Sequence, residues 1–294
     1  SDITRLNNAT LNIRGTNLGT TNVRNNQFRI VTSSEAAFIS TNLVGGGGAA
    51  GAKNISIVPW AVGEDIGSNA LAATNMGNSL LTYVSGAGFR PLDFTTEYNT
   101  FSAAATTDNV RESLSADLTG LTGKTINSLV LNNAATPALS VTGSGSGQSL
   151  AVTSGALLFT VTGAVTNTAY TTTLGGFDNG ITLGSTNEYV INVINPNSSN
   201  SLTTGSTTLG SSIVTVASTT GLQAGMPVFG AGIALGATVL SVTDATHFVM
   251  SLASTLSASS QTYQYATLES LTATITSSLT SIADITKSGR GTLI

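Results

Sequence analysis

The sequence predicts an all-β protein, and three observations carry this prediction. Charged residues make up only 8% of the 294-residue chain, against about 25% in an ordinary soluble domain. More than a third of the residues are Ser, Thr or Asn, and 32 are Gly. β-branched residues dominate, and several short stretches alternate between apolar and polar residues, which is the period of a β-strand. This composition favours extended β-structure with turns of small residues.

The clearest predicted strands lie in the second half of the chain, at residues 157–162 (LLFTVT), 189–193 (YVINV) and 271–275 (LTATI). Turns of small residues separate such strands, as at 143–147 (GSGSG) and 178–180 (DNG). The pattern alone leaves two architectures open. One is a β-sandwich, and the other is a parallel β-helix, whose coils stack about 4.8 Å apart. No clean repeat period decides between them.

One segment, residues 59–98, differs from the rest because it is rich in large apolar side chains. It also contains an Ala-, Leu- and Asn-rich stretch at 68–81. We predict a longer excursion from the regular coils, with a helical turn, that covers an apolar edge. The aromatic residues and the methionine of this segment are Trp60, Met76, Tyr83, Phe89, Phe94 and Tyr98.

A break in composition marks a second region. Asn is frequent up to Asn200 and does not occur after it, and Asp244 is the only formal charge between residues 202 and 265. Residues 213–216, 238–242 and 248–250 are predicted strands within this region. The region is therefore expected to form a compact all-β unit, and the polar residues 195–200 lead into it.

The last ten residues, 285–294 (ITKSGRGTLI), resemble the opening of the autotransporter-associated β-strand repeat, whose pattern is roughly T-K-x-G-x-G-T-L. The resemblance implies a right-handed parallel β-helix, or β-solenoid, in a large secreted or surface-displayed bacterial protein. It implies no catalytic residues, and residues 202–265 depart from the repeat pattern. Weaker similarities to proteins that carry this repeat occur, in order, at residues 6–19, 57–61, 88–92, 108–111 and 126–131.

With this resemblance, the predicted organisation is a β-helix interrupted by one module. Residues 1–201 are expected to form β-helix coils, with 59–98 as the longer excursion. Residues 202–265 are expected to form an inserted small β-domain, since exposed loops tolerate insertions. Residues 266–294 are expected to continue the β-helix.

The sequence contains no complete motif for nucleotide binding or for a serine hydrolase. The segment 120–125 (GLTGKT) suggests a phosphate-binding loop, but Leu118 stands where that motif needs Gly, and a strand follows instead of a helix. A turn is the prediction here, and the Gly-rich stretch 45–51 is predicted to be a loop. His247, the only histidine, would pair with Asp244 in a Ser-His-Asp arrangement. The two residues flank a tight turn and no nucleophile elbow is present, so a surface turn is predicted.

Metal sites and polysaccharide cleavage also lack a clustered motif. The absence of Cys excludes thiolate zinc sites. Residues 175–180 (GGFDNG) loosely resemble a calcium-binding β-helix repeat but occur once. We therefore predict no catalytic residue, no metal and no cofactor. The carboxylates considered for a polysaccharide-cleaving site are Asp93, Glu97, Asp108, Glu112 and Asp117. Four arginines could form a basic strip over successive coils, but we interpret them as solvated protection against edge pairing; they are Arg5, Arg14, Arg24 and Arg29.

Charge and hydropathy limit the partners. A net charge of −4 gives no basic face for nucleic acid, no apolar run is long enough to span a bilayer, and residues 1–5 read as mature sequence. The expected function is a structural, non-enzymatic segment of an extracellular or cell-surface bacterial protein, forming a stalk, matrix or fibre. Expected partners are further coils, either from end-to-end self-association or from a longer chain. The alternatives are an adhesin that binds glycan or another cell through 202–265 or 59–98, and a polysaccharide-active enzyme.

Overall fold

The computed structural model describes residues 3–15, 17–19, 32–65, 78–134, 136–162, 168–184, 188–195, 199–266, 270–280 and 284–294. The chain divides into two compact units. Unit 1 comprises Ser1–Ala164, Ala169–Pro196 and Ser270–Ile294, and unit 2 comprises Val165–Thr168 and Asn197–Glu269. Strands dominate both units, so the all-β class is confirmed. No helix in the described part of the chain is both long and apolar enough to cross a membrane.

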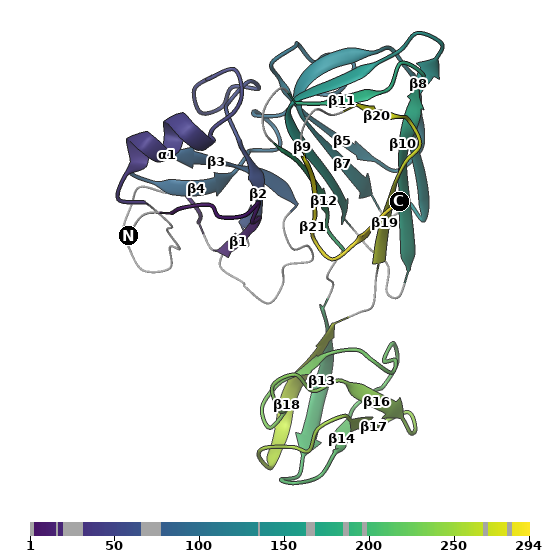
Figure 1. The fold of residues 1–294 in the computed structure, drawn as a ribbon. Helices are drawn as coiled ribbons and strands as arrows, with labels where there is room; N and C mark the ends of the chain where they lie inside the picture. The colour runs from purple at the N-terminus through teal and green to yellow at the C-terminus, as the bar shows by residue number, and fades with distance from the viewer. Residues whose placement is uncertain are drawn as a thin grey trace. The chain divides into compact units, whose positions relative to one another are not determined.

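Unit 1 begins with a four-stranded mixed sheet and one helix. The sheet order is β1 (Leu11–Gly15), β2 (Val58–Asp65), β3 (Ser79–Val84) and β4 (Gly88–Pro91). β1 pairs with β2 in parallel, whereas β2, β3 and β4 pair as antiparallel neighbours. The helix α1 (Glu35–Asn42) lies across this sheet (Figure 1) and buries Phe38 against Tyr83 and Phe89.

The remainder of unit 1 consists of parallel strands. One sheet has the order β22-β19-β10-β8-β6, from β22 (Thr292–Leu293), β19 (Ser270–Ile275), β10 (Ala169–Phe177), β8 (Ala138–Gly145) and β6 (Leu118–Leu121). A second sheet contains β5 (Asn109–Leu114), β7 (Lys124–Ala134), β9 (Leu150–Thr162), β11 (Ile181–Leu183), β12 (Glu188–Val193), β20 (Leu279–Thr280) and β21 (Asp284–Ser288). The chain passes back and forth between the two sheets, with the pairs β11–β12 and β20–β21 each contributing two consecutive strands to the second sheet, and Figure 1 shows both sheets as stacks of neighbouring arrows.

The bend inside β9 depends on glycine. Residues 150–152 of β9 pair with β11, whereas residues 156–159 pair with β12. Gly155 lies between these stretches with a φ of +71°, a backbone conformation that other residues rarely adopt. A Cβ at this position would lie 2.7 Å from the ring of Tyr189. The strand can therefore turn from one face of the stack to the next only with glycine here.

Apolar side chains from both parallel sheets share one core. Leu129, Leu157 and Ile191 occupy successive strands in register, and they meet Tyr170 and Leu271 of the other sheet. The residues between them, such as Val130 and Leu158, point to the opposite face and pack against Val62 and Leu80 of the N-terminal sheet. Strands buried on both faces are continuously apolar, which explains runs such as 129–131 and 157–159.

Unit 2 is a six-stranded antiparallel sheet with the order β15-β18-β13-β14-β17-β16. The strands are β13 (Ser199–Thr207), β14 (Ile213–Val216), β15 (Val228–Phe229), β16 (Val239–Val242), β17 (His247–Met250) and β18 (Ala258–Ala266). Its own core contains Val214, Met226, Phe248 and Tyr263. The predicted module, 202–265, lies inside this unit.

Two sequence expectations for the N-terminal third differ from the structure, and one helix there was not expected. The series of parallel strands around the shared core begins at the bridge between Asn99 and Val110, whereas the strands before it form the mixed sheet β1–β4, in which only β1 and β2 pair in parallel. The described parts of 59–98 cover a sheet face, formed by residues such as Val130 and Leu158, and not a sheet edge. The helix α1 was not expected from the sequence, because its residues show only a weak helical pattern of apolar side chains. The packing of its buried residue Phe38 stabilises the helix instead. The predicted helical turn at 68–81 falls largely outside the described residues.

Candidate binding pocket beside the parallel strands

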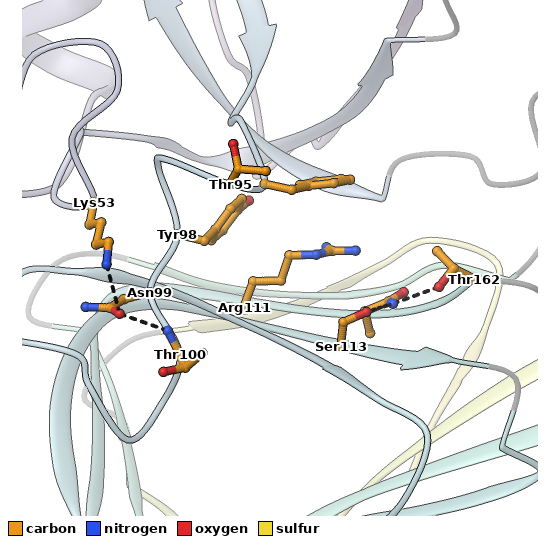
Figure 2. A pocket seen from close by; sticks show the side chains of 10 residues that line it. Lys53, Thr95, Tyr98, Asn99, Thr100, Arg111, Ser113 and Thr162 are labelled. Atoms are coloured by element: carbon orange, nitrogen blue, oxygen red, sulfur yellow. Dashed lines mark hydrogen bonds between the residues drawn. The ribbon is translucent and has the colours of Figure 1, made fainter.

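A pocket of about 540 Å³ lies in unit 1, where the loop after β4 passes over strands β5, β7 and β9. Figure 2 shows its long form: Lys53, Asn99 and Thr100 lie at one end, Ser113 and Thr162 at the other, with Arg111 and Tyr98 between them. This volume is within the range of about 300–1,000 Å³ that small-molecule sites occupy. The lining residues are Lys53, Phe94, Thr95, Tyr98, Asn99, Thr100, Arg111, Ser113, Asn132 and Thr162.

The loop that carries Phe94 and Thr95 is held by two carboxylates. Asp93 Oδ1 accepts hydrogen bonds from the hydroxyls and backbone N–H groups of Thr95 and Thr96. These bonds, led by the one from the Thr95 hydroxyl, lower the pKa of Asp93 to about 2. Glu97 accepts two hydrogen bonds of 2.6 Å from the Arg90 guanidinium and one of 2.7 Å from the Gly51 N–H.

The Glu97 carboxylate stays ionised although it is buried. Burial by itself would raise the pKa of Glu97, but the hydrogen bonds from Arg90, Gly51 and Asp93, with the charge of Arg90, bring the pKa below its ordinary value. The ionised Glu97 therefore holds the loop in place through its ion pair with Arg90. Tyr98 adds a second anchor, because its hydroxyl lies 3.1 Å from Ser79 Oγ and accepts a bond from the Leu80 N–H.

Arg111 forms the middle of the pocket wall. It stands on β5, with its guanidinium 4.0 Å from the centre of the Phe94 ring, and it donates a 2.8 Å hydrogen bond to the Asn78 carbonyl. Burial lowers its pKa, although guanidinium remains charged at ordinary pH. Among the described residues, no carboxylate forms an ion pair with Arg111 or with Lys53.

A row of polar side chains on successive strands completes the pocket. Asn132 of β7 donates to Ser113 of β5 at 2.5 Å and to Thr162 of β9 at 2.8 Å. Asn132 is 1% exposed, yet its Oδ1 has no hydrogen-bond partner among the described residues. A second row, away from the pocket, joins Asn109 Oδ1 to Asn127 and Ser128 at 2.8 Å each. Such rows tie neighbouring parallel strands together through side chains.

The carboxylates considered from the sequence accept hydrogen bonds from nearby backbone and side-chain groups. Asp108 accepts bonds from Asn99 and Ala105, Glu112 from the Phe101 N–H, and Asp117 from the Ser140 N–H. Burial raises the pKa of Glu112, and the bond from Phe101 opposes this rise. In the part of the chain that the structure describes, no three His, Cys, Asp or Glu residues gather as a metal site would require.

The other motifs are engaged in local structure. Lys124 of the 120–125 segment donates to the Ser102 and Ala104 carbonyls, and β7 begins at this lysine. Residues 175–180 end β10 and turn toward β11.

His247 lies with Asp244 in an exposed turn, where Nδ1 is 2.9 Å from Asp244 Oδ1. The Thr246 backbone N–H and then His247 lower the pKa of Asp244 to about 2.

The interpretation of the arginines as solvated edge protection is wrong for the two that are described. Arg5 pairs with Glu188 and lies over the Trp60 ring, and Arg14 pairs with Glu64, its cross-strand neighbour, at 3.2 Å. Arg24 and Arg29 lie outside the described residues. Opposite charges on adjacent strands stabilise the pairing directly.

Sequence reasoning did not single out the pocket residues Lys53, Arg111, Ser113 and Asn132 as a site. One sequence feature could have indicated this site: Arg111 lies in the middle of a strand that ends at Leu114, and it is close in sequence to the aromatic segment 59–98. What brings the residues together is strand register, which places Ser113 beside Asn132. No family model matches the chain, and comparisons with curated proteins and with solved structures give no match.

Proposed function

We propose that unit 1 contains a right-handed parallel β-helix and that the chain is a structural segment of an extracellular bacterial surface protein. The observation that carries this proposal is the register Val110, Leu129, Leu157, Ile191 across four neighbouring parallel strands. Each partner belongs to the next pass of the chain. Crossover connections between parallel strands are right-handed in nearly all proteins, which supports the proposed hand.

The supporting physical argument concerns load. Backbone hydrogen bonds join each pass to the next, and the buried amide rows at Asn109 and Asn132 add side-chain bonds in the same direction. Each such bond contributes about 1 kcal/mol of net stability. A stack connected in this way resists extension along its axis, as a stalk, matrix or fibre requires. The resemblance of residues 285–294 to the autotransporter-associated repeat supports the proposed location.

Further coils are the proposed partners. The outermost parallel strands carry N–H and C=O groups that another strand can pair with. Light scattering over a range of protein concentrations tests end-to-end association, which predicts a particle mass that rises with concentration. A mass that stays at one chain would contradict it.

Single-molecule extension tests the load-bearing role. Pulling the chain between residues 99 and 294 is expected to give several separate unfolding events, as stacked passes detach in turn. A single event at low force would contradict the proposal.

A binding role is the second candidate function, because the pocket combines an aromatic ring, amides, hydroxyls and two cations in one place. A glycan-binding screen with the intact chain tests it.

A further inference from the structure

The charged side chains that line the pocket are all positive. Its lining includes two cationic side chains, Lys53 and Arg111, and no carboxylate. Acidic groups close in sequence to the lining residues have other partners: Glu97 binds Arg90, Asp108 accepts from Asn99, and Glu112 accepts from the Phe101 N–H. Cations that lack an ion-pair partner in a concave, partly desolvated place attract anionic ligands strongly.

The two cations are held in place by neutral groups. Lys53 Nζ donates to Asn99 Oδ1 at 3.2 Å, and Asn99 is itself fixed by its bond to Asp108. Arg111 uses one bond to the Asn78 carbonyl and the face of the Phe94 ring. Since a guanidinium has five N–H donors, this arrangement leaves donors of Arg111 for a ligand. Preformed positions reduce the entropy lost when a ligand binds.

The far end of the pocket suits hydroxyl groups. Ser113, Asn132 and Thr162 form a row of small polar side chains, and the buried Asn132 Oδ1 is an acceptor without a partner among the described residues. The hydroxyl groups of Ser113 and Thr162 line this end, where they can exchange hydrogen bonds with hydroxyl groups of a ligand.

We propose that this pocket binds an acidic saccharide, whose carboxylate meets Lys53 and Arg111 and whose hydroxyls meet the row from Ser113 to Thr162. The proposal rests on the binding role named above as the second candidate, and it specifies the ligand class. It is independent of the β-helix proposal, since the parallel stack does not need an occupied pocket.

The experiment compares a galacturonic acid oligosaccharide with its methyl ester, which keeps the sugar rings and hydroxyls but replaces each charged carboxylate by a neutral ester with one added methyl group. Titration calorimetry of the full chain is expected to give at least about tenfold tighter binding of the acid than of the ester, with the difference shrinking as salt is added. Equal binding of acid and ester would overturn the acidic ligand and leave the binding role standing. No binding of either at millimolar concentration would overturn both.

Matched variants locate the site. Lys53→Gln keeps a donor for Asn99 and removes the charge, and we expect it to weaken binding of the acid by about fivefold, with Arg111→Gln weakening it by about tenfold or more. Lys287 is not among the pocket residues, and its Nζ donates to the Gly289 carbonyl. Lys287→Gln is therefore the control and is expected to leave binding of the acid unchanged. Because Arg111 also supports the loop, Lys53→Gln decides the question if Arg111→Gln fails to fold. Undiminished binding by folded Lys53→Gln would place the ligand elsewhere and overturn the proposal.

Discussion

Units 1 and 2 both pair β-strands around an apolar core, but the direction of the pairing differs between them. In unit 1 parallel strands stack in register, and buried amides such as Asn109 and Asn132 bridge neighbouring strands. In unit 2 all strand pairs are antiparallel, and the sequence has no Asn after Asn200, near the start of that unit. An amide can donate to one neighbour and accept from the other, which suits a stack. The disappearance of Asn along the chain therefore reflects, in part, a change in strand pairing.

The two units also differ in what covers their strands. Several strands of unit 1 are buried on both faces, by the shared core and by the N-terminal sheet. Unit 2 buries one cluster and leaves large apolar side chains in solvent, among them Leu209, Leu235 and Leu240. Unit 2 consequently depends on few core residues, and we expect it to be the less tolerant of a core truncation.

The largest expected effect follows from this dependence. Phe248→Ala removes a fully buried ring from the centre of unit 2 and should destabilise that unit by about 3–5 kcal/mol. Hydrogen exchange should show loss of protection in β14 and β17, with β7 and β9 unchanged. Phe229→Ala, which truncates a phenylalanine that is 47% exposed, is the control and should change little. Loss of protection in both units together would contradict their independence.

The amide row gives the next largest effect. Asn109→Ala removes bonds to the Lys53 and Ile55 carbonyls and the shared acceptor of Asn127 and Ser128, which leaves Asn127 Nδ2 with the longer bond to the Val44 carbonyl. The free energy of unfolding of unit 1 should fall by about 3 kcal/mol. Urea denaturation followed by fluorescence of Trp60, the only tryptophan and part of unit 1, measures this. Asn179→Ala, at an exposed turn, should leave the transition in place, and equal shifts in both variants would refute the role of the row.

A smaller, pH-dependent effect concerns the loop of the pocket. The pKa of Glu97 is lowered in the folded protein from an ordinary value of 4.5. Its contribution to stability is therefore present above pH 4.5 and is lost as pH falls through the lower, folded-state pKa. Glu97→Gln should reduce stability by about 2 kcal/mol at pH 7, and the difference from the natural chain should shrink in acid. A difference that is constant with pH would show that the charge of Glu97 is not what matters.

Removing residues 197–269, which make up most of unit 2, should have the smallest effect on unit 1. The Leu271 N–H donates to Asn195 Oδ1 at 2.9 Å, so the two chain ends that flank the module already lie together. Replacing residues 197–269 by a short linker should change the stability of unit 1 by less than about 1 kcal/mol, because loop-closure entropy depends weakly on length. Loss of cooperative unfolding, followed by Trp60 fluorescence, would contradict this expectation.

Local pattern predicted the strands that are buried on one face or flanked by clear turns. The predicted 189–193 and 271–275 stretches lie in β12 and β19, and 213–216 coincides with β14. The N-terminal sheet was not predicted, because its pairing joins residues far apart in sequence, such as Leu11 and Ala61. Local periodicity can indicate that a segment is a strand, but it does not indicate which distant strand it pairs with. The pocket escaped prediction for the same reason, since Arg111 and Thr162 lie on strands far apart in sequence and Lys53 lies in a turn before β2.

The central claim is that one parallel stack continues directly across the inserted unit, with β10 and β19 as adjacent strands. Thr171 and Thr272 are register partners on these strands, and the chain has no natural cysteine. Parallel partners about 4.8 Å apart are within reach of a disulfide. The double variant Thr171→Cys with Thr272→Cys should therefore cross-link on mild oxidation of the folded protein. The pair Thr171→Cys with Thr274→Cys, which is two residues out of register, should not. Equal cross-linking of both pairs, or none in either, would contradict the continuous stack.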